Sequence, residues 1–205
     1  MREGDTMSAK TEISDASHKK IVQRLGRLGD EFAWLDRLMI DWGDGKPREA
    51  YVAGLPDGAF VLPLLENGNV LLVHQYRLFN GGWRYEVPGG IVDKGESEEA
   101  AALRELEEEA GYKAGEMEKL LDFRPDPMLQ TTTHLYVARD LMKTKQRLDR
   151  GEAGMTVVEV TPAQFYEMTL DGTITDARTI LAALVAKERG ILLVGSKQLK
   201  KGHPF

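Results

Sequence analysis

Short apolar runs separated by turn-forming residues are the dominant pattern along this chain. Most of them have the length and the content of Val, Leu, Ile and aromatic residues typical of β-strands. The predicted strands cover residues 31–42, 48–53, 59–65, 69–75, 83–87, 120–124, 133–138 and 155–160. Between two of them, Glu66-Asn67-Gly68 carries the Asn-Gly signature of a hairpin turn. The pattern predicts that β-sheet is the main framework of the fold.

One segment follows a helical period instead. Leu103, Leu106 and Ala110 recur at intervals of three and four residues, which places them on one face of a helix predicted over residues 97–110. A serine stands at its N-cap position, glutamates follow in its first turn, and a glycine stands just after its end. We expect the apolar face of this helix to pack on the core.

Two further helices are predicted after the last strand, over residues 162–170 and 176–189. Strands that precede, separate and follow helices predict an α+β fold with a mixed sheet flanked by helices. The segment before Gly58 is expected to form a small antiparallel β unit of its own. The predicted organisation is therefore a poorly ordered N-terminus (1–20), an N-terminal β region (21–58), a main domain (59–192) and a basic C-terminal tail (193–205).

Composition narrows the class of protein. Of 205 residues, 42% are apolar and 29% are charged, as in an ordinary soluble globular protein. The net charge of −6 argues against nucleic acid or an anionic membrane as a main partner, and no apolar run has the length of a transmembrane span. The absence of cysteine excludes disulfides, thiolate metal sites and a cysteine nucleophile, and it favours a cytoplasmic protein.

A different face of the 97–110 helix carries the candidate chemistry. Glu105, Glu108 and Glu109 lie three and four residues apart, so their carboxylates converge on one side. Like charges at this spacing repel each other, and a divalent cation would offset the repulsion. Hard cations such as Mg²⁺ and Mn²⁺ take oxygen ligands and bridge carboxylates to substrate phosphates. An acidic helix face is more often merely solvated, so the surrounding residues have to decide between these interpretations.

The surrounding residues match the Nudix box at every specified position. The matching residues are Gly90, Glu96, Arg104, Glu105, Leu106, Glu108, Glu109, Gly111 and Tyr112. The chain therefore resembles the Nudix hydrolase family over residues 90–112. The resemblance implies an α/β/α sandwich and metal-assisted hydrolysis of a nucleoside diphosphate linked to another group.

Carried over by position, the resemblance assigns a role to each acidic residue of the box. It implies that Glu105 and Glu109 are the principal ligands of Mg²⁺ or Mn²⁺, with Glu108 in or next to the same shell. The carbonyl of Gly89 would add a backbone ligand. The cation would draw charge from the pyrophosphate and activate a water, whose proton a carboxylate accepts.

Two other positions in or beside the box are assigned to the catalytic and substrate-binding sets. Arg104 is placed in the catalytic set, where it is expected to pair with Glu96 and brace the loop against the helix. Gly90 is placed in the substrate-binding set, because Pro88-Gly89-Gly90 lets the backbone approach metal and phosphates without a Cβ.

The flanking residues are similar to the ADP-ribose and ADP-sugar pyrophosphatase branch of the family. The similar segments are Val73-His74-Gln75-Tyr76-Arg77, residues 83–90, residues 133–141 and residues 172–180. The resemblance implies that Arg77 binds a substrate phosphate and that Pro127 shapes the loop near the sugar. Residues 128–132 depart from the branch, which weakens any specific assignment to ADP-ribose.

A loop beyond the box supplies the last candidate. Relatives in this branch often take a catalytic glutamate from the mobile loop before the next strand, which implies Glu152 as general base or extra ligand. The glycines at 151 and 154 would allow it to move. Glu108 is the alternative base, and a solvated loop glutamate is the plainer interpretation of Glu152.

Several functions remain open at this point. The leading hypothesis is hydrolysis of a nucleoside diphosphate sugar of the ADP-ribose, ADP-sugar or GDP-mannose type. The alternatives are cleansing of damaged nucleoside triphosphates, which uses the same box, and a non-catalytic module that senses ADP-ribose. The resemblance also implies a homodimer formed through the N-terminal β region.

Overall fold

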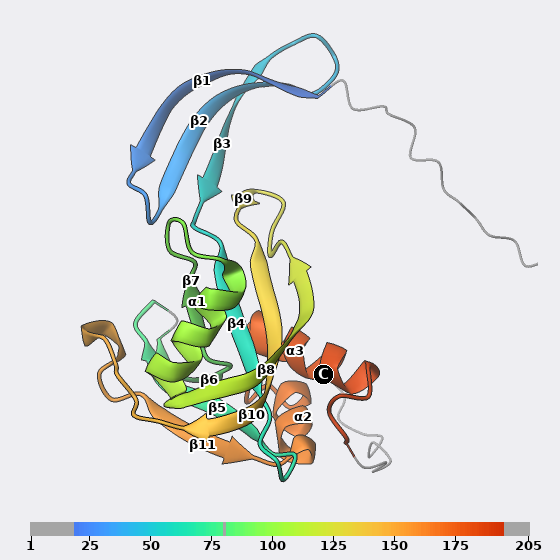
Figure 1. Ribbon diagram of the computed structural model, residues 1–205. Coiled ribbons are helices and arrows are strands. Elements are labelled where there is room, and N and C mark those ends of the chain that lie inside the picture. Colours follow the sequence, from blue (N-terminus) through green and yellow to red (C-terminus); the bar gives the residue numbers. More distant parts are fainter. Residues whose placement is uncertain (1–18, 80, 195–205) are drawn as a thin grey trace, which may run out of the picture. The chain divides into compact units, whose positions relative to one another are not determined.

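The computed structural model describes residues 19–79 and 81–194 and separates the chain into two compact units, Met1–Gly54 and Leu55–Phe205 (Figure 1). The division falls between Gly54 and Leu55, whereas the sequence placed the boundary near Gly58. The predicted N-terminal and C-terminal tails, residues 1–20 and 193–205, lie almost wholly outside the described residues.

The first unit holds three consecutive antiparallel strands. They are β1 (Lys20–Gly29), β2 (Trp34–Asp41) and β3 (Arg48–Gly54), paired in that order. The sequence patterns predicted β2 and β3 but not β1. All ten residues of β1 are exposed, so the strand has no buried face that would produce an alternating pattern. The buried carboxylate of Asp36 on β2 binds Arg27 on β1 through two hydrogen bonds of 2.8 Å.

The second unit holds two sheets. The first is mixed and has the order β7 (Gly89–Ile91), β4 (Gly58–Pro63), β10 (Thr133–Lys143) and β8 (Tyr112–Phe123). In it β4 runs parallel to β10, whereas β7 and β8 are antiparallel to their neighbours. The second is antiparallel and has the order β11 (Thr156–Val160), β5 (Val70–Arg77) and β6 (Gly82–Glu86).

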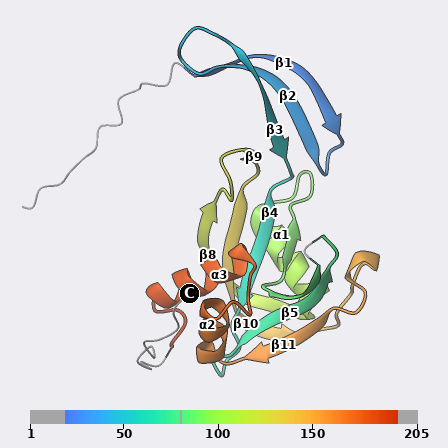
Figure 2. The same ribbon diagram turned by 180° about the vertical axis from the view of Figure 1, so that it is seen from behind.

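Helices cover the mixed sheet on both faces, as Figure 1 and the reverse view in Figure 2 show. On one face lie α1 (Glu98–Glu105) and the π-helical turn η1 (Leu106–Ala110). On the other lie α2 (Pro162–Leu170) and α3 (Ala177–Glu188). The predicted α+β class and its α/β/α sandwich are therefore confirmed. No helix among residues 19–79 and 81–194 is long and apolar enough to cross a membrane.

Strand β4 is buried on both faces and separates two apolar cores. Its Ala59 and Val61 pack with Ala101, Ala102 and Leu106 of the α1 and η1 layer. The alternate residues, Phe60 and Leu62, pack with residues of α2 and α3 in the larger core. Such two-sided burial is typical of a strand that has a parallel neighbour in an α/β layer structure. It also explains why the sequence there reads as a continuous apolar run.

The helix predicted over residues 97–110 is present as α1 followed by the π turn η1, and its buried face also differs from the prediction. Ser97 caps it as predicted, since its hydroxyl accepts a hydrogen bond from the Ala100 N–H at 3.2 Å. The core contacts come from Ala101, Ala102, Leu106 and Ala110, whereas Leu103 is only half-buried and outside the cluster. Ala101 and Ala102 make the core contacts that were predicted for Leu103, because the helix lies close to the sheet.

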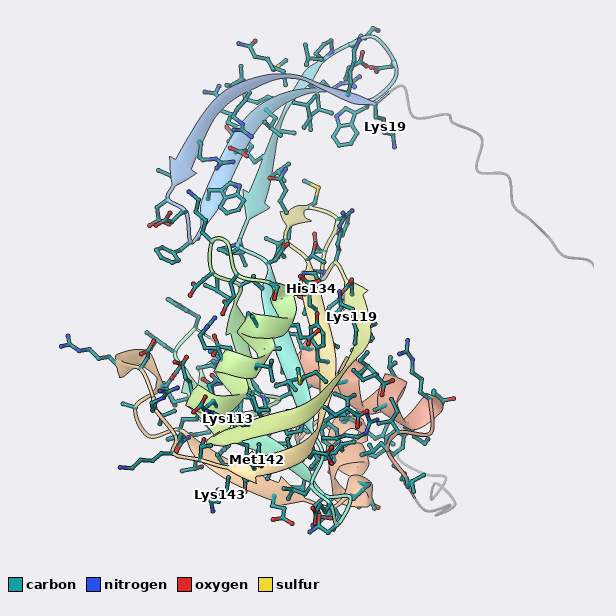
Figure 3. All side chains as sticks on the ribbon, viewed as in Figure 1. Lys19, Lys113, Lys119, His134, Met142 and Lys143 are labelled. Atoms are coloured by element: carbon teal, nitrogen blue, oxygen red, sulfur yellow. The ribbon has the colours of Figure 1, made fainter. Side chains whose placement is uncertain are left out.

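Two strands are longer than predicted. The predicted segments 120–124 and 133–138 belong to β8 and β10, which begin or end in polar residues that carried no strand signal. Side chains from these strands hold the start of α1: Lys119 donates to Glu98 and to Asp122, at 3.0 Å each. Asp122 also bonds His134 at 2.7 Å, and Figure 3 labels Lys119 and His134 on these neighbouring strands.

Substitution of Phe165 tests the larger core. Its side chain on α2 is fully buried, so Phe165→Ala should lower the free energy of unfolding by about 3–5 kcal/mol through lost burial and a cavity. Leu170→Ala is the matched control, because Leu170 lies on the same helix with 51% of its surface exposed. Denaturant unfolding would measure both, and similar losses for the two variants would contradict the assigned core.

Candidate active site

Glycines bring the short strand β7 against its neighbours with no room for side chains. Gly89 has a φ of +154°, and a Cβ there would lie 2.5 Å from the carbonyl oxygen of Ala59 and 2.6 Å from Cα of Phe60. At Gly90 a Cβ would meet the carboxylate of Glu105, with Cδ only 2.7 Å away. The backbone of β7 therefore lies directly beside the carboxylates of α1 and η1.

Glu109 is the most deeply buried acid of this group, with 3% of its surface exposed. Its Oε2 accepts a hydrogen bond of 2.8 Å from the Gly89 N–H. Burial raises the pKa of Glu109 to about 8, and the charges of Glu105 and Glu152 raise it as well, while the Gly89 N–H and Arg77 lower it. Glu109 is thus an acid held where its charged form is costly.

Arg104 binds the acids around the turn between β7 and α1. Its guanidinium donates to Glu96 at 3.0 and 3.1 Å, to Glu105 at 2.7 Å and to the carbonyl of Ile91 at 2.9 Å. Glu108 lies 3.4 Å from the same group. The pairing of Arg104 with Glu96 is therefore present as the resemblance implied. Its planar fork of donors joins loop and helix in a way a single ammonium group cannot.

Burial decides how the three helix acids differ. Glu105 has 8% of its surface exposed, and burial raises its pKa, an effect that Arg104 partly offsets. Glu108 is only half-buried. The sequence predicted that the three carboxylates converge on one side of the helix, and Glu105 and Glu109 are the two of them that are buried beside β7.

The donor chemistry of this cluster fits a hard divalent cation. Among residues 19–79 and 81–194, no three His, Cys, Asp or Glu side chains already stand in metal-binding geometry. However, Glu105 and Glu109 offer carboxylate oxygens, and the pKa of each carboxyl group is raised by burial and by the charges of neighbouring acids. A bound cation would remove both penalties, and oxygen ligands of this kind suit Mg²⁺ or Mn²⁺.

Arg77 lies next to this cluster and is already engaged. Its Nε and Nη2 bond Glu86 at 2.9 and 2.6 Å, and Arg178 of α3 donates to the same carboxylate at 3.0 Å. Arg178 also lies over the ring of Phe60, 4.3 Å from its centre. A cavity of about 260 Å³ opens between these arginines and the start of α3 at Thr175–Arg178.

The remaining candidates come from two loops. Glu152 ends the short 3₁₀ turn η2 (Arg150–Glu152), and its carboxylate accepts the Asp149 N–H at 2.9 Å. It is near enough to Glu105 and Glu109 for its charge to raise the pKa of both. Pro127 is exposed in the loop before β9 (Leu129–Gln130), and its predicted contact with the sugar stays a prediction.

Comparison with known proteins identifies the family. The family model of the NUDIX domain matches residues 54–184, which is more than half of the chain. The chain belongs to the Nudix family. The family predicted from the box is therefore confirmed, and all the matched residues except Gly54 lie in the second unit of the structure.

Relatives of this Nudix protein have names that refer to several nucleotide substrates. It is 31% identical over 146 residues to the ADP-ribose pyrophosphatase of Bacillus subtilis, covering 70% of this chain and 78% of that protein. It is 32% identical over 155 residues to the GDP-mannose pyrophosphatase of Yersinia enterocolitica, covering 71% and 80%. A solved structure titled ADP compounds hydrolase has a TM-score of 0.74 at 20% identity, over 83% of this chain and 93% of that one, which shows the shared fold.

Sequence patterns missed two residues of the candidate site. Glu86 is almost completely buried and joins Arg77 to Arg178, yet neither Glu86 nor Arg178 was singled out. The available signal was an acid at the end of the strand that leads into Pro88-Gly89-Gly90. A buried carboxylate requires a cationic partner, and Arg178 in the first turn of α3 supplies one in addition to Arg77.

Gly90→Ala tests the close approach of β7 to the acids. Its φ is not in the left-handed region, so the added methyl acts by displacing the Glu105 carboxylate and not by straining the backbone. We expect Mn²⁺ binding, measured by water-proton relaxation, to weaken by about 10-fold while the melting temperature changes little. Gly26→Ala, where a Cβ meets nothing within 4 Å, is the control. Unchanged Mn²⁺ affinity in Gly90→Ala would remove Glu105 from the ligand set.

Proposed function

We propose that this Nudix protein hydrolyses the pyrophosphate bond of a nucleoside diphosphate sugar. The products are a nucleoside monophosphate and a sugar phosphate. The observation that carries the proposal is the pair of buried acids, Glu105 and Glu109, against the glycine backbone of β7 inside a matched Nudix domain. The pyrophosphatase names of the Bacillus and Yersinia relatives support a sugar-linked diphosphate as the substrate class.

In the proposed mechanism, Glu105, Glu109 and the carbonyl of Gly89 hold a divalent cation, with Glu108 in or next to this shell. Magnesium is the proposed ion and manganese the alternative. When bound, the cation supplies charge neutralisation at the diphosphate and a lower pKa for the attacking water. Arg104 fixes the carboxylate of Glu105 by its 2.7 Å hydrogen bond, so the ligand does not have to be ordered during the reaction.

The protein's acids also handle the proton. Water adds to one phosphorus, the bridging P–O bond breaks, and the proton of the water passes to a carboxylate. Glu152 is the proposed acceptor, because it lies near both buried acids on a turn that contains Gly151 and is followed by Gly154. Glu108 is the alternative, being half-buried and within reach of Arg104.

The substrate side of the site is assigned to Arg77, Gly90 and Pro127. Arg77 donates to Glu86 through Nε and Nη2, and its Nη1 is proposed to donate to a substrate phosphate. Gly90 lets the diphosphate approach the backbone. Pro127 is proposed to shape the loop near the sugar.

The N-terminal unit is proposed to form a homodimer. Its strands and turns leave large apolar side chains exposed, among them Ile21, Leu28, Phe32 and Trp42. An exposed apolar surface of this kind on a small β unit favours burial against a second copy. The cytoplasmic location expected from the lack of cysteine stays a prediction.

A hydrolysis screen tests the function and its substrate together. The protein is incubated with Mg²⁺ and each of four compounds in turn: ADP-ribose, ADP-glucose, GDP-mannose and UDP-glucose. We expect it to hydrolyse at least one of them to a nucleoside monophosphate and a sugar phosphate. Glu109→Gln is the inactive control, since it keeps the side-chain volume and removes a ligand charge; we expect a loss of about 100-fold or more in kcat. Hydrolysis only of nucleoside triphosphates would indicate pool cleansing. Binding of ADP-ribose without hydrolysis would indicate a sensing module.

Glu152→Gln separates the two candidate bases. If Glu152 accepts the proton, the variant should lose about 100-fold in kcat at saturating metal, with a small change in KM. Glu66→Gln, on an exposed turn, is a control for the loss of one negative charge. Full turnover by Glu152→Gln would assign the role to Glu108.

A further inference from the structure

The end of the metal-ligand helix is closed by a segment from a distant part of the chain. We call residues 144–147, which follow the last residue of β10, the strap. Its Thr144 N–H donates to the carbonyl of Gly111 at 2.7 Å, and its Arg147 N–H donates to the carbonyl of Glu108 at 2.8 Å. Lys143, labelled in Figure 3, is the residue directly before it.

The side chain of Gln146 completes this arrangement. Its Nε2 donates a hydrogen bond of 2.6 Å to the backbone carbonyl of Glu109. The carbonyls at the end of a helix have no partner within it, so those of Glu108 and Glu109 need donors from elsewhere. The Gly111 N–H serves only the carbonyls of Leu106 and Glu107.

Glu109 is consequently fixed at both ends. Its carboxylate accepts the Gly89 N–H at 2.8 Å, and its carbonyl accepts the Gln146 amide. The second contact matters because η1 is a single π turn of five residues, with i→i+5 bonds in place of the i→i+4 bonds of an α-helix, and the Glu109 carbonyl near its end takes its partner from outside the turn. Without the Gln146 amide, the buried backbone carbonyl of Glu109 would lose its hydrogen-bond partner, at the residue whose carboxylate is proposed to bind the cation.

The approach of the strap to the helix end is close. Gly111 ends η1 with a φ of +72°, and a Cβ there would lie 3.0 Å from the backbone nitrogen of Gln146. The strap also continues within two residues into Asp149 and the turn that carries Glu152. One short segment thus joins the end of the acidic helix to the loop of the proposed base.

We propose that Gln146 is a positioning residue, whose side-chain amide holds the Glu109 carbonyl and so sets where the Glu109 carboxylate lies. This inference rests on the proposed function in naming Glu109 as a metal ligand. Gln146 itself is not proposed to touch metal or substrate. Its effect is on the affinity for the cation and on kcat, not on substrate binding.

The test compares variants of two glutamines. Gln146→Met keeps the volume and removes the donor, and Gln146→His restores an N–H donor without a charge at pH 8. Gln164→Met is the matched control, because Gln164 accepts a 3.0 Å hydrogen bond from the Thr161 N–H in the capping box of α2. For each variant we would measure Mn²⁺ affinity by water-proton relaxation, the Mg²⁺ dependence of hydrolysis, kcat, KM and the melting temperature.

We expect Gln146→Met to weaken Mn²⁺ binding and lower kcat by about 10-fold each, with KM within about two-fold of wild type. Gln146→His should recover part of both losses. Gln164→Met should lower the melting temperature without changing the response to metal.

Two results would overturn the inference. One is wild-type Mn²⁺ affinity in Gln146→Met, and the other is a Gln146→His variant no better than Gln146→Met. The Mn²⁺ titration does not depend on turnover. If the wild-type protein hydrolyses no substrate, the proposed function fails, while weaker Mn²⁺ binding in Gln146→Met still supports the role of Gln146.

Discussion

The burial of Glu109 against the backbone of β7 is the constraint on which the site depends. Its carboxylate is almost without solvent, beside a second buried acid, and its stabilising contact is the N–H of Gly89. An acid in this position is costly for the folded chain unless something positive is added. The folded chain therefore leaves the negative charge of Glu109 only partly compensated, and a bound divalent cation would compensate it.

The arginines around Glu109 are paired with other acids. Arg104 satisfies Glu96 and Glu105, while Arg77 and Arg178 share the single carboxylate of Glu86. Each arginine is thereby held in place by an acid that does not need the metal. Glu96 and Glu86 thus position the arginines, while Glu109 takes no hydrogen bond from any of these three arginines.

The sequence was most informative where one residue type is required by local chemistry. The Ser97 cap and the mixed sheet flanked by helices could be predicted from spacing, capping and the order of elements, and the box residues from their resemblance to the Nudix family. Strand β1 could not be predicted, because its exposed residues carry no periodicity. The partnership of Glu86 with Arg178 was also missed, since it joins residues 92 positions apart that only the packing of α3 brings together.

The small residues between α1 and the mixed sheet have a consequence for how this site can change. Ala59 on β4 and Ala101 and Ala102 on α1 are completely buried at that layer. Their methyl groups act as spacers that determine how far the acidic helix stands from β7. A larger side chain at any of them would lift the helix and withdraw its carboxylates from the glycine backbone, although no charged group had been altered. Substitutions in this apolar layer are therefore limited by the distance that the carboxylates of the helix must keep from β7, and not only by the volume available in the core.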